Sequence, residues 1–224
     1  MPADKLADLA ALLADRTRAR FCLTLLDGRA WTSSELATAA GVTASTASEH
    51  LTRLISAGFL AERRQGRHRY VQLAGPKEAD LLEHLLAYLG PAEPAKTLKA
   101  TTASAALARG RTCYDHLAGR LGVAITDAMA ARNLLDDDLT LTDHGLAWLT
   151  DTLGFTPPKT RRPVAKPCLD WTERRSHLAG AAGAHICSRL HANGWVKPIG
   201  TGRAVKVTPK GEKALRDLLG LAPL

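Results

Sequence analysis

Long apolar runs are absent from this sequence of 224 residues. No stretch reaches the roughly 18 uncharged apolar residues that suggest a membrane-spanning helix. The opening segment, MPADKLADLAALL, mixes apolar and acidic residues, which is typical of an amphipathic helix and not of a signal peptide. The sequence therefore predicts a protein that makes no membrane contact and works in the cytoplasm.

The motifs of common catalytic sites are also missing. The chain contains no Gly-x-Ser-x-Gly, no His-Glu-x-x-His and no phosphate-binding-loop sequence. Cys113 and His116 are the only nucleophile and base in close sequence proximity, and no third group is in sight to orient them. We therefore do not expect an enzyme.

Cysteine is scarce, with four residues in the chain. Four thiols without a secretion signal fit a reducing compartment and not a disulfide scaffold. Cys22 and Cys187 lie in apolar helical contexts, and we expect Cys22 to be a small core residue.

The most informative stretch that is present runs from Gly41 to Leu73. Thr43 is expected to cap a helix whose apolar face recurs at helical spacing, with Ala47, Leu51, Leu54 and Ile55. The opposite face carries short polar or basic side chains: Ser45, Thr46, Ser48, Glu49, His50, Thr52 and Arg53. Such side chains let a helix enter the major groove and meet base edges and phosphates. An ordinary solvated helix is the alternative.

The flanking segments favour DNA recognition. Upstream, residues 31–41 predict a short helix that is capped by Thr32 or Ser33 and ends in a turn at Gly41. Downstream, two short strands flank an arginine-rich tip, which predicts a hairpin that contacts phosphates. A charged surface hairpin that only aids solubility is the alternative.

Residues 15–73 resemble the ArsR family of bacterial winged-helix repressors. The resemblance rests on D-x-T-R-x-R, S-E-L-A, S-T-x-S-x-H-L and G-R-x-x-Y, in that order along the chain. It implies a homodimer that places one recognition helix in each half-site of a roughly palindromic double-stranded operator. By position, it assigns the DNA contacts to Ser45, Thr46, Ser48, His50, Arg53, Arg64, Arg67 and Arg69. Glu49 departs from the family, in which a basic or amide side chain is common.

The metal-sensing cysteine box of that family, E-L-C-x-C-D, is absent, because residues 34–38 stand in its place without cysteine. A second family site uses acidic and His ligands on the helix after the wing, where Asp80 and His84 lie one turn apart. No partner His follows in that helix. We therefore interpret both as charged residues beside a dimer seam, which consists of Leu81, Leu82, Leu85, Leu86 and Leu89.

The chain is more than twice as long as a winged-helix module needs, which predicts a second domain. Proline, glycine and alanine between residues 90 and 95 interrupt the helical pattern. We predict a DNA-binding and dimerisation domain at 1–90, a linker at 91–101 and an effector-sensing domain at 102–224.

The second domain contains an internal repeat. HLAGRLG at 116–122 and HLAGAAG at 177–183 share five of seven residues. A second matching block lies farther along each copy, and its larger offset implies five inserted residues at 198–203. Repeat 1 covers about 103–156 and repeat 2 about 164–224.

The order of elements in each repeat resembles the back half of a winged helix. The predicted fold class is therefore mostly α with small β wings. It combines an N-terminal winged helix-turn-helix with a helical C-terminal domain that is built from two winged-helix-like repeats.

The repeated cysteines and histidines suggest one kind of sensor. Cys113 and His116 are three residues apart, as two ligands on one helical turn would be, and Cys168 with His177 is a looser copy. If the copies pack together, the four would suit a thiophilic divalent metal such as zinc, cadmium or lead. The two cysteines alone could instead form a redox disulfide. Packing residues retained by both copies are the alternative.

A small organic effector is another hypothesis, because Trp148, Trp171 and Trp195 all lie in the second domain and could line an apolar pocket. We predict a dimeric transcriptional repressor that an effector in this domain releases from its operator. A winged-helix module for protein contact is the alternative from another class, and the arginine-rich wing argues against it.

Overall fold

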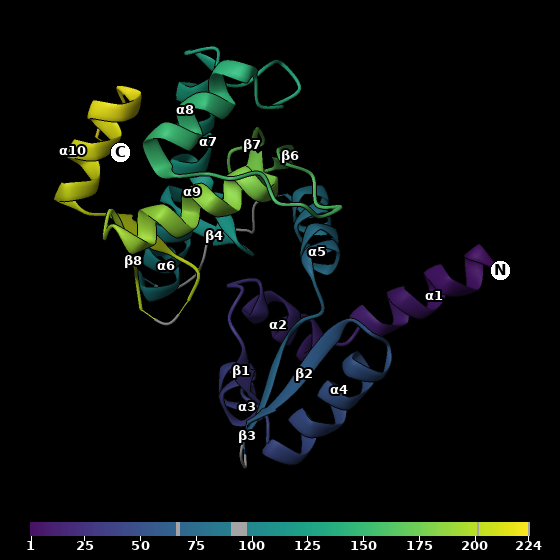
Figure 1. Cartoon of the computed structure of the whole chain (residues 1–224). Coiled ribbons are helices and arrows are strands. Elements are labelled where there is room, and N and C mark those ends of the chain that lie inside the picture. Colours follow the sequence, from purple (N-terminus) through teal and green to yellow (C-terminus); the bar gives the residue numbers. More distant parts are fainter. Residues whose placement is uncertain (66–67, 91–97, 201, 224) are drawn as a thin grey trace. The chain divides into compact units, whose positions relative to one another are not determined.

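The computed structural model describes residues 1–65, 68–90, 98–200 and 202–223, which form two compact units, 1–82 and 83–224 (Figure 1). The division falls within helix α5 (Pro76–Leu89), so this helix contributes to both units. Of the predicted linker, residues 91–97 lie outside the described residues. Among the residues that are described, no helix is both long and apolar enough to span a bilayer.

The N-terminal unit combines helices with a small antiparallel sheet in the order β1-β3-β2. Its elements before α5 are α1 (Pro2–Leu13), α2 (Arg16–Leu25), β1 (Trp31–Thr32), α3 (Ser33–Ala40), α4 (Ala44–Ser56), β2 (Leu60–Gln65) and β3 (His68–Leu73). Thr32 and Thr43 cap α3 and α4 with their side chains, as predicted. Gly41 ends α3 with a φ of 69°, which favours glycine and allows the tight turn into α4.

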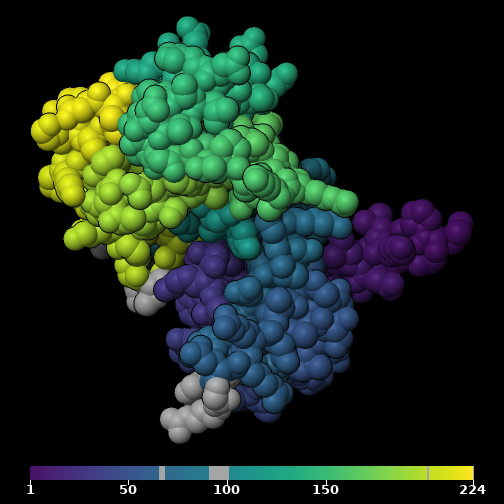
Figure 2. Space-filling view, viewed as in Figure 1, coloured from purple at the N-terminus to yellow at the C-terminus, as the bar shows by residue number. Residues whose placement is uncertain are grey.

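The predicted apolar face of α4 lies in the core of this unit. Ala47, Leu51 and Leu54 are fully buried, and Cys22 of α2 is a core residue as expected. By contrast, α1 contributes no buried residue. Figure 2 shows this helix standing out from the rest of the N-terminal unit, and Leu6 is exposed on it.

The C-terminal unit contains the two repeats in sequence. Repeat 1 comprises α6 (Leu98–Arg109), β4 (Arg111–Cys113), β5 (His116–Ala118), α7 (Gly119–Ala130) and α8 (Asp143–Leu153). Repeat 2 comprises β6 (Lys166–Leu169), β7 (Ser176–Ala179), α9 (Gly180–Ala192), β8 (Val196–Pro198), β9 (Val205–Val207) and α10 (Pro209–Leu219). Both halves thus have the same order of hairpin, helix, second β connection and closing helix.

Equivalent caps and glycines confirm the match between the closing helices. Thr142 and Thr208 cap α8 and α10. A Cβ atom on Gly145 would lie 1.9 Å from the Leu134 carbonyl oxygen, and one on Gly211 would lie 2.0 Å from that of Trp195. Both closing helices therefore need glycine at the same place, where they cross the preceding backbone.

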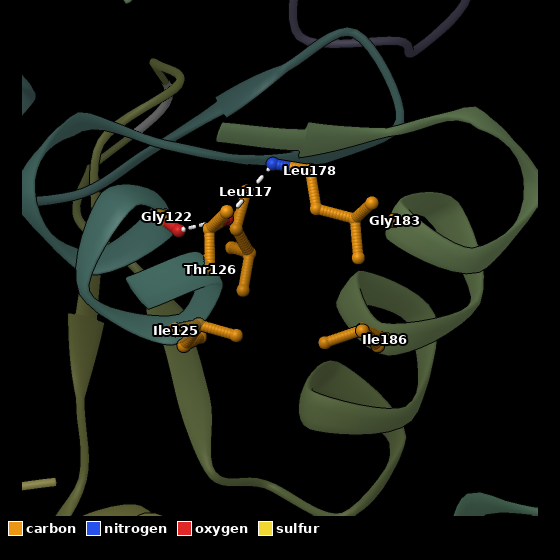
Figure 3. Close-up of a pocket in the computed structure, with 7 residues that line it drawn as sticks. All are labelled: Leu117, Gly122, Ile125, Thr126, Leu178, Gly183 and Ile186. Carbon is orange, nitrogen blue, oxygen red and sulfur yellow. Dashed lines mark hydrogen bonds between the residues drawn. The ribbon is translucent and has the colours of Figure 1, made fainter. Parts of the chain in front are cut away.

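The two repeats pack against each other through their central helices. Figure 3 looks between α7 and α9, with Gly122 on one and Gly183 on the other. A Cβ atom on either glycine would come within 2.4 Å of a carbonyl oxygen of its own repeat. The Thr126 hydroxyl of repeat 1 accepts a hydrogen bond from the Leu178 amide of repeat 2, at 2.8 Å. The repeats consequently share one core, in which the gap between α7 and α9 has a volume of only about 10 Å³.

Candidate functional sites

The polar face of α4 is open to solvent in the N-terminal unit. Ser45, Ser48 and Arg53 are exposed, while Thr46 is half-buried. Thr43 holds Ser45 and Thr46 in place, because its hydroxyl lies 2.9 Å from each of their hydroxyls. This face presents short side chains of the kind that can approach base edges in a major groove.

Two of the predicted contact residues on α4 have partners within the protein. Arg53 donates a hydrogen bond to Glu49 at 3.0 Å, one turn away, so Glu49 neutralises part of this face. His50 is half-buried, and its Nδ1 atom lies 3.3 Å from Arg18 and 3.6 Å from Asp15 at the start of α2. Arg53 can exchange its exposed partner for DNA, whereas His50 is held against α2.

The predicted wing is a hairpin of β2 and β3. Arg64 is exposed, and Arg69 lies opposite it and donates to Glu62. Arg67, the third predicted contact of the wing, lies outside the described residues. Among the described residues of the wing, Arg64 is an exposed cation with no ion-pair partner, whereas Arg69 is already paired with Glu62.

Four buried donor atoms meet in the C-terminal unit. Cys113 and His116 face each other across the β4–β5 hairpin, and Cys168 and His177 face each other across β6–β7. One ligand atom from each residue can be chosen so that all four lie within 4.8 Å of one another. The two sulfur atoms are 3.8 Å apart, and the Nε2 atoms of the two histidines are 3.1 Å apart.

The expected helical turn is wrong for this group of residues. The residues from Cys113 to His116 form the turn of a hairpin, in which Tyr114 adopts a φ of 59°. The three-residue spacing that suggested a helix therefore reflects a two-residue connection between paired strands. The longer interval between Cys168 and His177 is a wider connection of the same kind.

A hydrogen bond between the two sulfur atoms couples the thiols of Cys113 and Cys168. A hydrogen bond with Cys168 and burial raise the pKa of Cys113 well above its ordinary value. The same hydrogen bond, together with both histidines, lowers the pKa of Cys168 despite its burial. The lowered pKa favours the thiolate form at Cys168. A thiolate is the form in which cysteine binds metal or attacks an oxidant.

Each histidine has an aspartate beside its outer nitrogen. His116 Nδ1 lies 3.3 Å from Asp115, and His177 Nδ1 lies 3.3 Å from Asp170. Burial disfavours protonation of His177, but Asp170 and the Cys168 thiolate outweigh it and raise the pKa to about 9. Because each carboxylate lies beside Nδ1, the Nε2 atom on the other side of each ring points into the cluster. The Cys-x-Asp pattern in both repeats was the sequence signal for these partners, whose role sequence reasoning missed.

The donor set fits a thiophilic ion. Zinc binds sulfur at about 2.3 Å and imidazole nitrogen at about 2.0–2.1 Å, so a tetrahedral ion separates two sulfurs by about 3.8 Å and two nitrogens by about 3.3 Å. The observed separations, 3.8 Å and 3.1 Å, are close to both values. A carboxylate on the outer nitrogen of a metal-binding histidine is a common supporting contact.

The expected tryptophan pocket is not assembled. Trp148 and Trp195 do line one apolar cavity, but its volume is about 10 Å³, enough for about one water molecule. Trp171 lies elsewhere, with Arg111 stacked 4.6 Å from the centre of its ring. The three indoles therefore do not form a common site for an organic effector.

Comparisons with known proteins place the chain among regulators. Residues 13–63 match a helix-turn-helix domain family. YdfF of Bacillus subtilis (strain 168), described as an uncharacterized HTH-type transcriptional regulator, is 34% identical over 222 residues, which cover 96% of this chain and 97% of YdfF.

The solved structures that match include the following two. The cadmium metal-sensor CMTR from Mycobacterium tuberculosis is 37% identical over 35% of this chain and 81% of its own, with a TM-score of 0.31. The homodimeric winged helix-turn-helix DNA-binding domain of Mb0332 from Mycobacterium bovis is 31% identical over 39% and 80%, with a TM-score of 0.35. Because the match to YdfF spans nearly all of both chains, this protein belongs to the helix-turn-helix transcriptional regulators, which are DNA-binding proteins and not enzymes.

Proposed function

We propose that the protein is a dimeric repressor that binds double-stranded operator DNA in the cytoplasm and is released by a thiophilic divalent metal ion. The DNA contacts are Ser45, Thr46, Ser48, His50 and Arg53 of α4 with Arg64, Arg67 and Arg69 of the wing. The metal ligands are Cys113, His116, Cys168 and His177.

The exposed polar face of α4 beside a cationic hairpin supports the DNA contacts. In this arrangement the helix reads base edges, and Arg64 contacts phosphate and displaces counterions. Arg53 leaves Glu49 when it meets DNA, since an exposed pair of this kind contributes little to stability.

Uncovered apolar side chains support a dimer. Leu6 of α1 is 68% exposed, and on α5 Tyr88 and Leu89 are 88% and 75% exposed. Such side chains on two helices favour burial against a second copy. Leu85 and Leu89 belong to the predicted dimer seam.

The four converging donor atoms carry the metal assignment. Each hairpin supplies one sulfur and one nitrogen, so an ion bound here would join the two repeats. When bound, the ion supplies the strong electrostatic attraction that holds two thiolates side by side. Asp115 and Asp170 orient the histidines toward it.

The distance of 3.8 Å between the cysteine sulfurs also favours a redox signal as a second candidate. The Cys168 thiolate would attack hydrogen peroxide and break its O–O bond, which forms a sulfenic acid at Cys168 and releases hydroxide. Cys113 would then lose its proton and attack the Cys168 sulfur, and the disulfide closes as the sulfenic oxygen leaves as water. The peroxide takes up the two electrons that the thiols lose.

The DNA assignment is tested with a duplex that full-length protein selects from a random library. Arg53→Ala should weaken binding to this duplex by roughly 1–3 kcal/mol, while Arg64→Ala should weaken all duplexes alike and lower the salt slope by about one. Lys213→Ala, which removes an exposed charge in the C-terminal unit, is the control. Unchanged binding by both arginine variants across a salt titration would contradict the assignment.

The effector is tested by titrating the protein–duplex complex with zinc, cadmium and lead salts. We expect a fall in duplex affinity of about 5- to 150-fold for wild type and none for a Cys113→Ser, Cys168→Ser double variant. Cys187→Ser, another buried thiol outside the cluster, is the matched control. A parallel titration with peroxide and no metal tests the redox signal separately from the metal effector. If neither metal nor peroxide changes duplex affinity, both effectors are wrong.

A further inference from the structure

Glu83 of α5 is a buried carboxylate with an unusual environment. Its side chain is 1% exposed, and Oε1 accepts a hydrogen bond from Arg203 at 2.7 Å. The other oxygen, Oε2, is buried and has no hydrogen-bond partner among the described residues. Burying an ionised carboxylate with half of its acceptors unused is costly, so this residue depends on Arg203 for its compensation.

Arg203 comes from the segment that distinguishes the two repeats. In repeat 1 the connection before the closing helix is a short loop closed by the Leu135–Leu141 bridge. In repeat 2 the equivalent β8–β9 connection is five residues longer, and it carries Arg203. The insertion therefore supplies the cation that meets Glu83, and repeat 1 has no equivalent.

Arg203 is also bonded to the strand that carries Cys113. The Thr112 amide donates to the Arg203 carbonyl at 3.0 Å, and the Arg203 side chain contacts the Thr112 carbonyl at 3.4 Å. Thr112 directly precedes the first cysteine of the cluster. The neighbouring Arg111 pairs with Ala204 in an isolated β-bridge, which fixes the same register. A continuous series of contacts therefore links Cys113 to Glu83 through Thr112 and Arg203.

We propose that the Glu83–Arg203 ion pair couples occupancy of the Cys/His cluster to helix α5. This inference rests on the proposed metal effector. An ion bound to Cys113 fixes β4, β4 sets the place of Arg203, and Arg203 holds or releases the carboxylate of α5. Because α5 contains residues of both compact units, a change at Glu83 is passed along one continuous helix toward the N-terminal unit.

The energetics make this pair sensitive to small displacements. Breaking a buried ion pair leaves an uncompensated charge, which is far less favourable than loosening an exposed pair. A shift of β4 would lengthen the contact between Arg203 and Glu83. We expect α5 to move with Arg203, because a Glu83 carboxylate left behind without its partner would be a buried, uncompensated charge. Glu83 also lies within electrostatic reach of the cluster, since its charge is among the causes that raise the pKa of Cys113, after the hydrogen bond between Cys113 and Cys168 and burial.

The test compares full-length wild type with Glu83→Gln and Arg203→Gln, each first loaded with Co²⁺ to verify metal binding from the thiolate absorption band. Amide hydrogen exchange is then measured with and without saturating Zn²⁺. In wild type we expect Zn²⁺ to change exchange at residues 83–89 by at least about fivefold. In both variants this change falls below about twofold, while protection of residues 111–118 and 166–179 remains.

Asp127→Asn is the matched control, because it removes a carboxylate that pairs with Arg175 on the surface of the same unit. It should respond as wild type does. A full response of α5 in either Glu83→Gln or Arg203→Gln would overturn the coupling. Absence of the Co²⁺–thiolate band in wild type would instead contradict the metal site itself, so the two failures are distinguishable.

Discussion

The β4–β5 and β6–β7 hairpins of the C-terminal unit each carry one cysteine and one histidine of the cluster, in different surroundings. Asp170, beside His177, is fully buried and accepts hydrogen bonds from Arg111, Thr172 and the amide of Gly119 in the other repeat. Asp115, beside His116, is 28% exposed and pairs with Arg162 at 2.7 Å. The two hairpins hold the same kinds of donor atom, whereas the packing around them differs.

This difference separates two roles of the same motif. In repeat 2 the aspartate is part of the core, because it joins both repeats and compensates a buried arginine. In repeat 1 the aspartate lies at the edge, where solvent screens its ion pair. In the cluster, His177 therefore lies beside an aspartate that several buried groups fix in place. His116 lies beside an aspartate whose ion pair reaches solvent.

The largest effect is expected for Asp170→Asn. This change leaves Arg111 buried without a counter-charge, so the free energy of unfolding should fall by roughly 3–5 kcal/mol. Urea denaturation of metal-free protein measures the loss. Asp115→Asn should cost less than about 1 kcal/mol in the same assay, because its ion pair reaches solvent. Equal losses would show that the two halves are energetically equivalent.

The ligands themselves should behave alike in both halves. A buried zinc site of four ligands contributes about 10–16 kcal/mol, so the loss of one donor should reduce binding by roughly 3 kcal/mol, or more than about 100-fold. Competition with a chelator would measure Zn²⁺ affinity for Cys113→Ser and Cys168→Ser separately. A tenfold difference in Zn²⁺ affinity between the two variants would contradict equal contributions of the two cysteines.

The contrast between hairpins also explains what the sequence could predict. Thr43, Gly41 and the apolar spacing of α4 act locally, so the recognition helix and its turn follow from neighbouring residues. The repeat was visible because the two copies of His-Leu-Ala-Gly can be aligned directly. A separate Cys-x-Asp match, at an offset of 55 residues instead of the 61 residues of that alignment, pairs Cys113 with Cys168.

Other features depend on contacts that no local pattern contains. Strands of three residues are too short for an alternating pattern, and the small apolar residues around His116 also suit a helix, so the hairpin was missed. The ion pair between Glu83 and Arg203 joins residues 120 positions apart. The presence of three tryptophans in one domain does not place them together. Trp171 stacks on Arg111 and does not join Trp148 and Trp195.

A smaller effect should appear where α7 and α9 cross their own strands. Gly122→Ala and Gly183→Ala each add a carbon 2.4 Å from a backbone carbonyl oxygen of Leu117 or Leu178. Overpacking of this kind costs about 1–3 kcal/mol. Thermal unfolding should show similar losses for both variants, with Gly154→Ala as a control that meets no atom within 4 Å but has a φ of 70°. If only one of the two glycines is sensitive, the close approach of each central helix to the strand of its own repeat is not equivalent in the two repeats.

The smallest effect, and the sharpest test of the asymmetry, concerns the pair of Asp115 and Arg162. Arg162 also donates to the Gly180 carbonyl at 2.9 Å, so Arg162→Gln removes a partner of Asp115 and a contact to α9 together. A double-mutant cycle with Asp115→Asn isolates the interaction between the two side chains, which should be about 0.2–1 kcal/mol and should weaken with salt. The same cycle for Arg111→Gln and Asp170→Asn should give a larger coupling that salt barely changes, because both side chains are fully buried. A salt-insensitive coupling of equal size at Asp115 would mean that repeat 1 also builds its aspartate into the core, and the proposed distinction between the two histidines would then be lost.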